Sequence, residues 1–516
     1  MNSFSLIIEY SIKIKSVGRM FTKYIFFALF VLCNLYSTAL SATYHVTVSG
    51  DDTIGTGSTL APWATITHAL DNVEDGSIID VHPGIYTGRI RIRGTFAQGV
   101  TVRSQPPYMA KLRNNGTVIT VYTHPDGVSG IHIEGFDIAH SGSGAEALVV
   151  HVDGGGNNEV RNITFKNNIL HDSYNNDILK INNACTNILV SGNMFYNQTG
   201  SDEHIDINSV SDVIVENNIF FNDFEGSGRV NQNNTSSYIV VKDSNGAGDI
   251  FTGSRNITIR RNVFMNWQGS TGSNFVLLGE DGQSFYEAYD VLVENNLMLG
   301  NSPHVMRSAF GVKGCRDITF RNNTISGDLP SLAYAMRVNR EGNNLANSNI
   351  SFFNNIWSDQ SGTMGSENND PSRNDFSDTN ASDILSFTLD NNLYWNGGAA
   401  VPEDENELIN YIDDSSRLIA DPQLPVPVDV ILPRWLEDNV QFADGASTIR
   451  AVFQELVSYA NPTSGSPVID QANGNFAPID DILGNMRPAH KDIGAFEKGT
   501  GVSVPKPIIP IFFLLL

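Results

Sequence analysis

A short segment of the sequence, residues 201–209, combines acidic, imidazole and amide side chains. Its sequence is SDEHIDINS, in which Glu203 and Asp206 offer carboxylate oxygens and His204 offers an imidazole. Carboxylate oxygens bind hard cations such as calcium, and an imidazole can remove a proton from a substrate. The segment therefore predicts acid–base chemistry, with calcium as the candidate cofactor.

Two lysines occur in the apolar segments on either side, Lys180 before residues 201–209 and Lys242 after them. A lysine acts as a general base where its neighbours lower its pKa. Similar apolar segments further along the chain carry more cations, and the segment that contains Lys242 begins with a tyrosine. The candidate catalytic residues are Lys242, Lys180, His204 and Arg337, the candidate substrate-binding residues are Arg307, Lys313 and Tyr238, and the candidate metal ligands are Glu203, Asp206 and Asp243.

Each of these candidates also has a purely structural interpretation. Lys180 and Asp206 could form a salt bridge between neighbouring strands on a solvated face. His204 could be an ordinary surface histidine, and Glu280 and Asp281 could shape a glycine-flanked turn. The sequence alone leaves these alternatives open.

A repeated pattern predicts the elements that position these residues. Each copy alternates apolar and polar residues for four positions, reaches an asparagine, and then becomes apolar again, which indicates two strands that meet at a corner. A repeat with a fixed core and a variable remainder is typical of a solenoid. Asparagine suits the corner because it tolerates left-handed backbone angles, and its amides can form a ladder from coil to coil. The predicted fold is all-β, a right-handed parallel β-helix. The eight aligned asparagines are Asn168, Asn193, Asn218, Asn262, Asn296, Asn323, Asn355 and Asn392.

The two ends of the chain predict export and capping. Basic residues precede an apolar run at residues 24–35, as in a secretory signal, and this run is too short to span a membrane. A helix near residues 65–72 should cover the open end of the coils, and another is expected at 447–459. The predicted protein is secreted, to the extracellular space, the periplasm or the cell surface. Its predicted parts are a signal peptide (1–41), a β-helix (42–400), a C-terminal cap region (401–497) and an apolar tail that could serve in sorting (498–516).

The net charge restricts the kinds of partner the protein can bind, and the cysteine positions indicate whether disulfides stabilise it. A formal net charge of −24 argues against nucleic acid as a partner and is compatible with bound calcium. Cys185 and Cys315 precede equivalent repeats four coils apart, which is about 19 Å at roughly 4.8 Å per coil. A disulfide cannot bridge that distance. The sequence therefore predicts two free thiols, and we expect a monomer.

Motifs near both ends of the predicted helix carry a resemblance to a known superfamily. They are YHVTVSGDD with APWATITHAL and IIDVHPGIYTGRIRI near the start, and SPVIDQA with DDILGNMRPAHKDIGAFE near the end. Over residues 43–497 the chain resembles the pectate-lyase-like superfamily of secreted polysaccharide enzymes. These motifs are specific for architecture rather than chemistry, so the individual family stays unresolved. The signature motifs of polygalacturonases, mannuronan epimerases and pectin methylesterases are missing from the sequence.

The resemblance implies a polysaccharide substrate and, most directly, a lyase. β-Elimination from a uronate needs a base for the C5 proton and a cation that holds the adjacent carboxylate. The segment YIVVKDSN from Tyr238 resembles the alginate lyase and chondroitinase B pattern, which puts Lys242 in the position of the base. One alternative is a glycoside hydrolase on the same fold, with Asp206 and either Glu280 or Asp281 as its carboxyl pair. Another is a non-catalytic protein that binds glycans or lies at the cell surface.

Overall fold

The computed structural model describes residues 41–122, 127–363, 365 and 375–499. Two compact units are distinguished, Met1–Ala42 and Thr43–Leu516, and the second contains the predicted solenoid. The predicted signal peptide and apolar tail lie almost entirely outside the described residues. Within those residues, no helix has both the length and the apolar character needed to cross a membrane.

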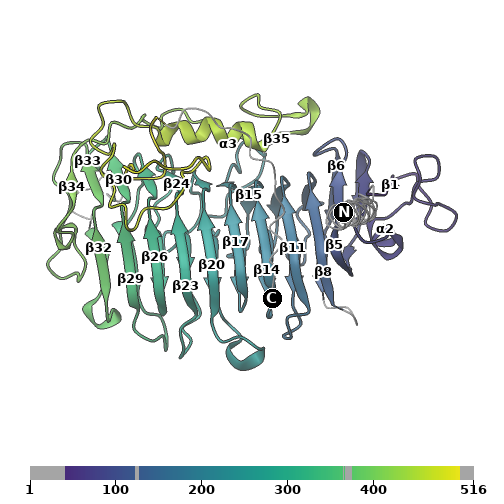
Figure 1. Cartoon of the computed structure of the whole chain (residues 1–516), viewed down its shortest axis with the longest axis horizontal. Helices are drawn as coiled ribbons and strands as arrows, with labels where there is room; N and C mark the ends of the chain where they lie inside the picture. The colour runs from purple at the N-terminus through teal and green to yellow at the C-terminus, as the bar shows by residue number, and fades with distance from the viewer. Residues whose placement is uncertain (1–40, 123–126, 364, 366–374, 500–516) are drawn as a thin grey trace, which may run out of the picture. The chain divides into compact units, whose positions relative to one another are not determined.

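Three long parallel sheets form the second unit, and each turn of the chain adds one strand to each sheet in the order 1, 2, 3. This arrangement is a right-handed parallel β-helix, as predicted, and Figure 1 shows sheet 1 facing the viewer. Sheet 1 consists of β1 (Thr43–Val46), β2 (Ile78–Val81), β5 (Gly94–Ser104), β8 (Val128–Glu134), β11 (Val160–Lys166), β14 (Thr186–Ser191), β17 (Ser211–Glu216), β20 (Ser254–Arg260), β23 (Ala288–Glu294), β26 (Cys315–Arg321), β29 (Ser348–Phe353) and β32 (Phe387–Asp390).

Sheet 2 follows sheet 1 around the corner that the asparagines occupy. Its strands are β3 (Gly84–Thr87), β6 (Ala110–Asn114), β9 (Asp137–His140), β12 (Ile169–Ser173), β15 (Met194–Gln198), β18 (Ile219–Phe221), β21 (Val263–Phe264), β24 (Leu297–Leu299), β27 (Thr324–Ser326), β30 (Ile356–Asp359), β33 (Leu393–Asn396) and β34 (Leu418–Ile419).

Sheet 3 carries the charged segments that the sequence singled out. Its strands are β4 (Ile90–Ile92), β7 (Ile119–Tyr122), β10 (Val150–Asp153), β13 (Leu179–Asn182), β16 (Glu203–Asn208), β19 (Ser237–Lys242), β22 (Asn274–Leu278), β25 (Ser308–Lys313), β28 (Ala333–Asn339) and β31 (Asp375–Asp378).

The predicted asparagine ladder is present at the corner between sheets 1 and 2. The backbone N–H and the Nδ2 of Asn168 donate to Oδ1 of Asn193, at 2.9 and 3.1 Å, and the same pattern continues coil by coil to Asn392. All the ladder asparagines are fully buried. The left-handed angles fall on the preceding residue instead, such as Asn167 (φ 54°) and Asn217 (φ 59°). The sequence argument therefore placed the ladder correctly and the strained residue one position too late.

The two predicted helices cover different parts of the unit. α2 (Ile66–Asn72), with Thr65 as its N-cap, packs at the N-terminal end against β1, β2, β4 and β5. α3 (Ile449–Val457) lies along the outer face of sheet 2, as Figure 1 shows above the strands of that sheet. Its residues Val452 and Phe453 join an apolar cluster with Met194 and other outward side chains of sheet 2. A two-stranded ribbon, β35 (Trp435–Leu436) with β36 (Gln441–Phe442), precedes α3.

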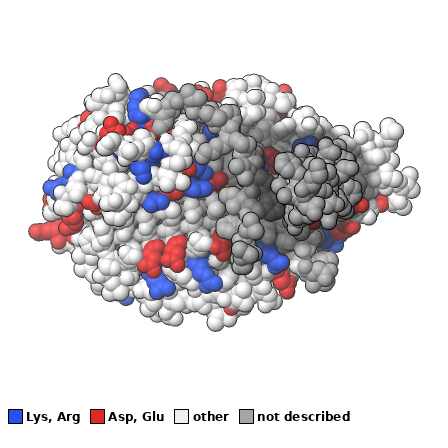
Figure 2. Space-filling model, viewed as in Figure 1, with Lys and Arg blue, Asp and Glu red and all other residues white. Residues whose placement is uncertain are grey.

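Interior packing accounts for the stability of the stack without cross-links. Both Cys185 and Cys315 are free and fully buried, which confirms the prediction for these two thiols. They join a continuous core of aliphatic and aromatic side chains between the three sheets. On the side of sheet 1, acidic and basic residues are interspersed, as Figure 2 shows. Pairs such as Glu294 with Arg321, at 2.7 Å, explain this even distribution of charge.

Candidate functional site

The outer face of sheet 3 brings the predicted charged residues together. Strand register pairs Lys180 of β13 with Asp206 of β16, and Lys180 donates a hydrogen bond to that carboxylate. Lys242 of β19 pairs in register with Asn208, so it lies one strand further along the stack and two residues nearer the strand end than Asp206. The predicted adjacency of Lys180 and Asp206 is confirmed, and the salt bridge between them is real.

Three carboxylates converge where β13 and β16 begin. Oxygens of Asp177, Asp202 and Glu203 lie within 4.8 Å of one another. Lys180 links them to Asp206, because its Nζ is 3.7 Å from Asp177 Oδ2 and also bonds Asp206. We call Asp177, Asp202, Glu203 and Asp206 the acidic cluster.

Sequence reasoning missed Asp177 and Asp202, and a usable signal existed for one of them. Asp177 and Glu203 occupy the same position, two residues before the matched pair Leu179 and Ile205. In a solenoid, equivalent positions of successive coils lie side by side, so this alignment alone would have placed Asp177 beside Glu203. Asp202 lies in the loop before β16, where the repeat gives no register.

The negative charge of the acidic cluster exceeds the positive charge of the residues around it. Glu280 and Asp281 adjoin it through Lys242, so six carboxylates face two lysines when all are ionised. Burial, reinforced by the Asp206 charge, raises the pKa of Asp177 to about 7. Burial, reinforced by Glu280 and Asp177, also raises the pKa of Glu203 well above its ordinary value. Such shifts are the response of buried carboxylates that lack sufficient cations.

Two oxygens of the cluster are also left without hydrogen bonds. Among the residues that the structure describes, Asp177 Oδ2 and Asp206 Oδ1 are buried and have no hydrogen-bond partner. Buried polar atoms are nearly always satisfied, so such atoms call for an explanation. A hard cation takes six to eight oxygen ligands, mainly carboxylates and carbonyls. The donor set, its excess charge and its unsatisfied oxygens all fit calcium.

Lys242 lies beside the cluster and responds to its field. Its ammonium group is ion-paired with Glu280 and lies 3.8 Å from Asp281. Burial alone would lower the pKa of Lys242, but the charges of Asp206, Glu280, Glu203 and Asp281 together raise it above the ordinary value. A cation bound by Glu203 and Asp206 would offset two of these four charges, and burial would then weigh more strongly towards the neutral amine.

Two predicted site residues lie in the interior instead of on the outer face of sheet 3. The His204 ring stacks on that of Tyr238 at 4.4 Å, and both side chains are fully buried. Burial lowers the pKa of His204 to about 3, and the Tyr238 hydroxyl donates to the carbonyls of Met265 and Asn266. Neither the predicted catalytic His204 nor the predicted substrate-binding Tyr238 therefore lies on the outer face beside Lys180 and Asp206. Strict alternation fails near the start of these strands, where the chain enters from a loop.

Asp243, a predicted metal ligand, has a structural role. Its carboxylate accepts hydrogen bonds from the backbone N–H groups of Asn245, Gly246 and Gly253, at 2.8, 2.9 and 2.6 Å. It follows the last residue of β19, so its side chain points into the loop after the strand. The oxygens of Asp243, predicted as a metal ligand, are thus already used by the backbone of this loop.

The cations predicted further along the stack do lie on sheet 3. Arg337 Nε is 3.1 Å from Asp378 Oδ2, Arg307 Nε is 3.6 Å from the same oxygen, and Lys313 pairs with Glu341. Register places Arg337 four strands beyond Asp206, about 19 Å away at the usual strand spacing. Arg337, predicted as catalytic, therefore lies too far along the stack to act on the same bond as a residue at Asp206.

Loops border this face on both sides. The segment 222–236 connects β18 to β19 and touches the cluster, since Ser236 N–H donates to the Asp202 carbonyl at 2.9 Å. Arg229 holds this segment in place through Asp172 at 2.7 Å. On the other side, the turn that contains Glu280 is ordered by Glu287, which accepts its backbone N–H at 2.9 Å.

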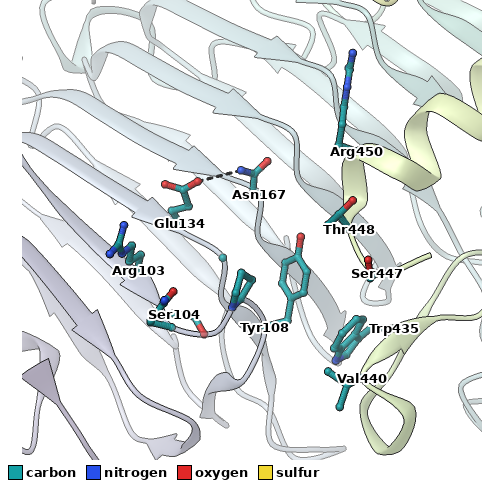
Figure 3. A pocket seen from close by; sticks show the side chains of 13 residues that line it. Arg103, Ser104, Tyr108, Glu134, Asn167, Trp435, Val440, Ser447, Thr448 and Arg450 are labelled. Atoms are coloured by element: carbon teal, nitrogen blue, oxygen red, sulfur yellow. Dashed lines mark hydrogen bonds between the residues drawn. The ribbon is translucent and has the colours of Figure 1, made fainter. Parts of the chain in front are cut away.

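A separate cleft of about 610 Å³ lies between the sheet 1–sheet 2 corner and the segment before α3. Figure 3 shows its lining, in which Glu134 accepts a hydrogen bond from Asn167 at 3.0 Å, while Tyr108 and Trp435 close one side. The cleft contains none of the predicted site residues.

Comparison with known proteins gives only distant structural similarity. No protein-family model and no curated protein matches the chain. Similar solved structures include pectate lyase Pel9A, with 14% identity and a TM-score of 0.46 over 89% of this chain and 97% of that chain. They also include XylC in complex with xylose (10% identity, TM-score 0.46, 88% of this chain and 98% of that chain) and PfbA, a surface adhesin of Streptococcus pneumoniae (15%, 0.45, 64% and 80%). The parallel β-helix of this chain is established by its own three sheets, and its chemistry has to be argued from the site itself.

Proposed function

We propose that the protein is a secreted lyase that cleaves a uronate-containing polysaccharide by β-elimination and uses calcium. The observation that carries this proposal is the acidic cluster, with its excess charge and unsatisfied oxygens, beside the buried amine of Lys242. Secretion is supported by the predicted N-terminal signal. An elongated face bordered by loops also suits a polymer better than a small molecule.

Each residue of the site has a distinct task in the proposed reaction. Asp177, Asp202, Glu203 and Asp206 would hold calcium, and Lys180 orients Asp206 through its ion pair. When bound, calcium supplies a positive charge for the substrate carboxylate and for the negative charge that develops next to it.

Lys242 is the proposed base. Its Nζ takes the C5 proton of the uronate, the electron pair of that C–H bond forms the C4–C5 double bond, and the bond from C4 to the glycosidic oxygen breaks. The neutral amine that this step requires is favoured by burial, and calcium held by Glu203 and Asp206 would offset two of the four carboxylate charges that oppose it. The leaving oxygen takes a proton from solvent, which completes the reaction.

The ultraviolet absorbance of the unsaturated product tests this proposal. The protein is incubated with polygalacturonate, alginate and other uronate or sulfated glycans, with calcium or with a chelator. We expect calcium-dependent absorbance from the conjugated uronate. Reducing ends that appear without this absorbance would instead indicate a hydrolase, and binding without any cleavage would indicate a non-catalytic glycan-binding protein.

A further inference from the structure

The cleft of about 610 Å³ beside α3 is lined in part by a strained residue. Val440 follows the short 3₁₀ helix η6 (Glu437–Asn439), in the turn that joins β35 to β36, and has φ 52° and ψ 43°. A branched side chain makes this left-handed conformation costly, and glycine or asparagine is the usual residue there. The valine side chain is also 48% exposed, so neither backbone geometry nor burial accounts for it.

Val440 belongs to an apolar wall of the cleft. Figure 3 shows it next to Trp435, which in turn packs edge to face on Tyr108 with ring centroids 5.1 Å apart. We call Tyr108, Trp435 and Val440 the apolar wall. Residues held in strained conformations cluster at ligand sites. A ligand that contacts the wall would explain why an exposed, strained valine stands at this position.

The opposite side of the cleft is polar. Glu134 is the last residue of β8 and Asn167 follows the last residue of β11, so both lie at the corner between sheets 1 and 2. Glu134 Oε1 accepts a hydrogen bond from Asn167 Nδ2 at 3.0 Å. No described residue donates a hydrogen bond to Glu134 Oε2 or to Asn167 Oδ1. These two oxygens can therefore accept hydrogen bonds from a ligand.

The charged groups near this polar side are already paired with one another. Arg103 Nε lies 2.7 Å from Asp80 Oδ1, and Glu134 Oε1 lies 3.7 Å from Lys166 Nζ. Arg450 also lines the cleft, but Figure 3 shows its side chain extended away from the other labelled residues. A ligand of this cleft therefore does not need a charge of its own.

We propose that this cleft binds a neutral saccharide, as a second glycan site separate from the outer face of sheet 3. A pyranose ring has an apolar C–H face and an edge of hydroxyl groups. The C–H face would lie against Trp435 and Val440, and the hydroxyl groups would donate to Glu134 and Asn167. The volume lies within the range of roughly 300–1,000 Å³ that is usual for small-molecule sites. This inference does not depend on the proposed lyase function.

Titration with small sugars, followed by calorimetry and saturation-transfer NMR, tests the site. The ligands are xylose, galactose, N-acetylglucosamine and their disaccharides, with galacturonate as the charged comparison. We expect a neutral saccharide to bind, and galacturonate to bind more weakly because the cations are already paired. Glu134→Gln should raise the Kd of that saccharide by about tenfold, since it removes a charged acceptor. Glu216→Gln, which changes a carboxylate three strands further along the same row of sheet 1, is the matched control.

Val440→Asn separates a role in binding from a purely structural role. Asparagine tolerates the left-handed conformation, so the melting temperature should equal or exceed that of the parent. The Kd of the saccharide should nevertheless rise several-fold, because an apolar contact is lost. A variant with the parental Kd would overturn the proposal, since the strained valine would then contribute nothing to a ligand.

A variant of sheet 3 locates the bound saccharide. Lys242→Ala should bind the neutral saccharide as the parent does, because Lys242 lies on the other glycan-facing surface. Loss of binding in this variant would place the saccharide on sheet 3 and overturn the second site. Preference for galacturonate over every neutral saccharide, or no binding of any of them, would overturn it as well.

Discussion

The protein buries two clusters of charged residues, and they differ in how their charges are balanced. Under the C-terminal segment, His171 lies between Asp137 and Asp172, at 2.8 Å from each carboxylate. Arg113 forms an ion pair with Asp137, and Arg229 forms one with Asp172, both at 2.7 Å. Although burial opposes it, the two aspartates raise the pKa of His171 to about 9, and the pKa values of both aspartates are lowered.

The acidic cluster of sheet 3 shows the opposite response. There the pKa values of Asp177, Asp202 and Glu203 rise, because burial and the neighbouring carboxylates outweigh the two lysines. A balanced buried cluster ties segments together without a further charge, although Asp137 Oδ2 has no hydrogen-bond partner among the described residues, whereas an unbalanced cluster is stable only with added protons or an added cation. Charge balance, rather than the number of charged residues, therefore distinguishes the structural cluster from the candidate site.

Removal of Lys242 should have the largest effect on function. We expect Lys242→Ala to lower the rate of product formation by at least about a hundredfold, as for loss of a general base, with a melting temperature in calcium close to that of the parent. Lys242→Arg keeps the charge but cannot deprotonate, so it should be equally inactive. Lys166→Ala, on sheet 1, is the control. An active Lys242→Arg enzyme would exclude this residue as the base.

Calcium dependence should follow the acidic cluster specifically. Asp206→Asn should raise the calcium concentration needed for half-maximal activity by about tenfold or more, since it removes a charged ligand. Asp212→Asn changes a carboxylate in the same coil but on sheet 1, and should behave like the parent. Calorimetric titration with calcium checks the same order of affinities without substrate. Equal affinities in the two variants would remove Asp206 from the metal site.

The balanced cluster should affect stability and leave chemistry unchanged. His171→Gln leaves buried carboxylates with one cation fewer, so we expect the free energy of unfolding to fall by about 3 kcal/mol. His490→Gln, an exposed histidine in the C-terminal segment, should have little effect. Denaturant titration measures both, and the activity per folded molecule should stay at the parental level. A similar stability for the two variants would mean that the His171 network contributes nothing.

The pH dependence of the unfolding free energy should distinguish the two clusters, and we expect it to be the smallest of these effects. Without calcium, the folded state holds more protons than the unfolded state between about pH 4 and 7, since the pKa of Asp177 rises from 3.8 to about 7. Stability should therefore fall as pH rises through that window. Calcium should abolish the fall, and Asp177→Asn should reduce it, because Glu203 also has a raised pKa. The pKa of His171 rises from 6.5 to about 9, so its contribution is present below pH 6.5 and lost towards pH 9. That second loss should persist with calcium and disappear in His171→Gln. The unfolding free energy is measured across pH with and without calcium. An equal effect of calcium on the Asp177 range and on the His171 range would contradict the difference between the two clusters.

How much the sequence predicted depended on distance from the regular strands. The asparagine ladder, the three-sheet coil and the adjacency of Lys180 and Asp206 were predictable because each coil repeats the same alternation. Asp202 was missed because it lies in a loop, where register is not encoded locally. The errors at His204 and Asp243 share this cause, since one lies near the start of a strand and the other just past the end, where alternation no longer sets the direction of a side chain.

The final member of the asparagine ladder differs in kind from the others. Asn392 donates from its backbone and its side chain to Asp414, which takes the position of the next asparagine as acceptor. A carboxylate accepts hydrogen bonds but has no N–H to offer to a further coil. Asp414 therefore terminates the chain of amide bonds, and because its own side chain is fully buried, no amide donor is left at this corner for a further coil. The ladder thus ends inside the chain that forms it.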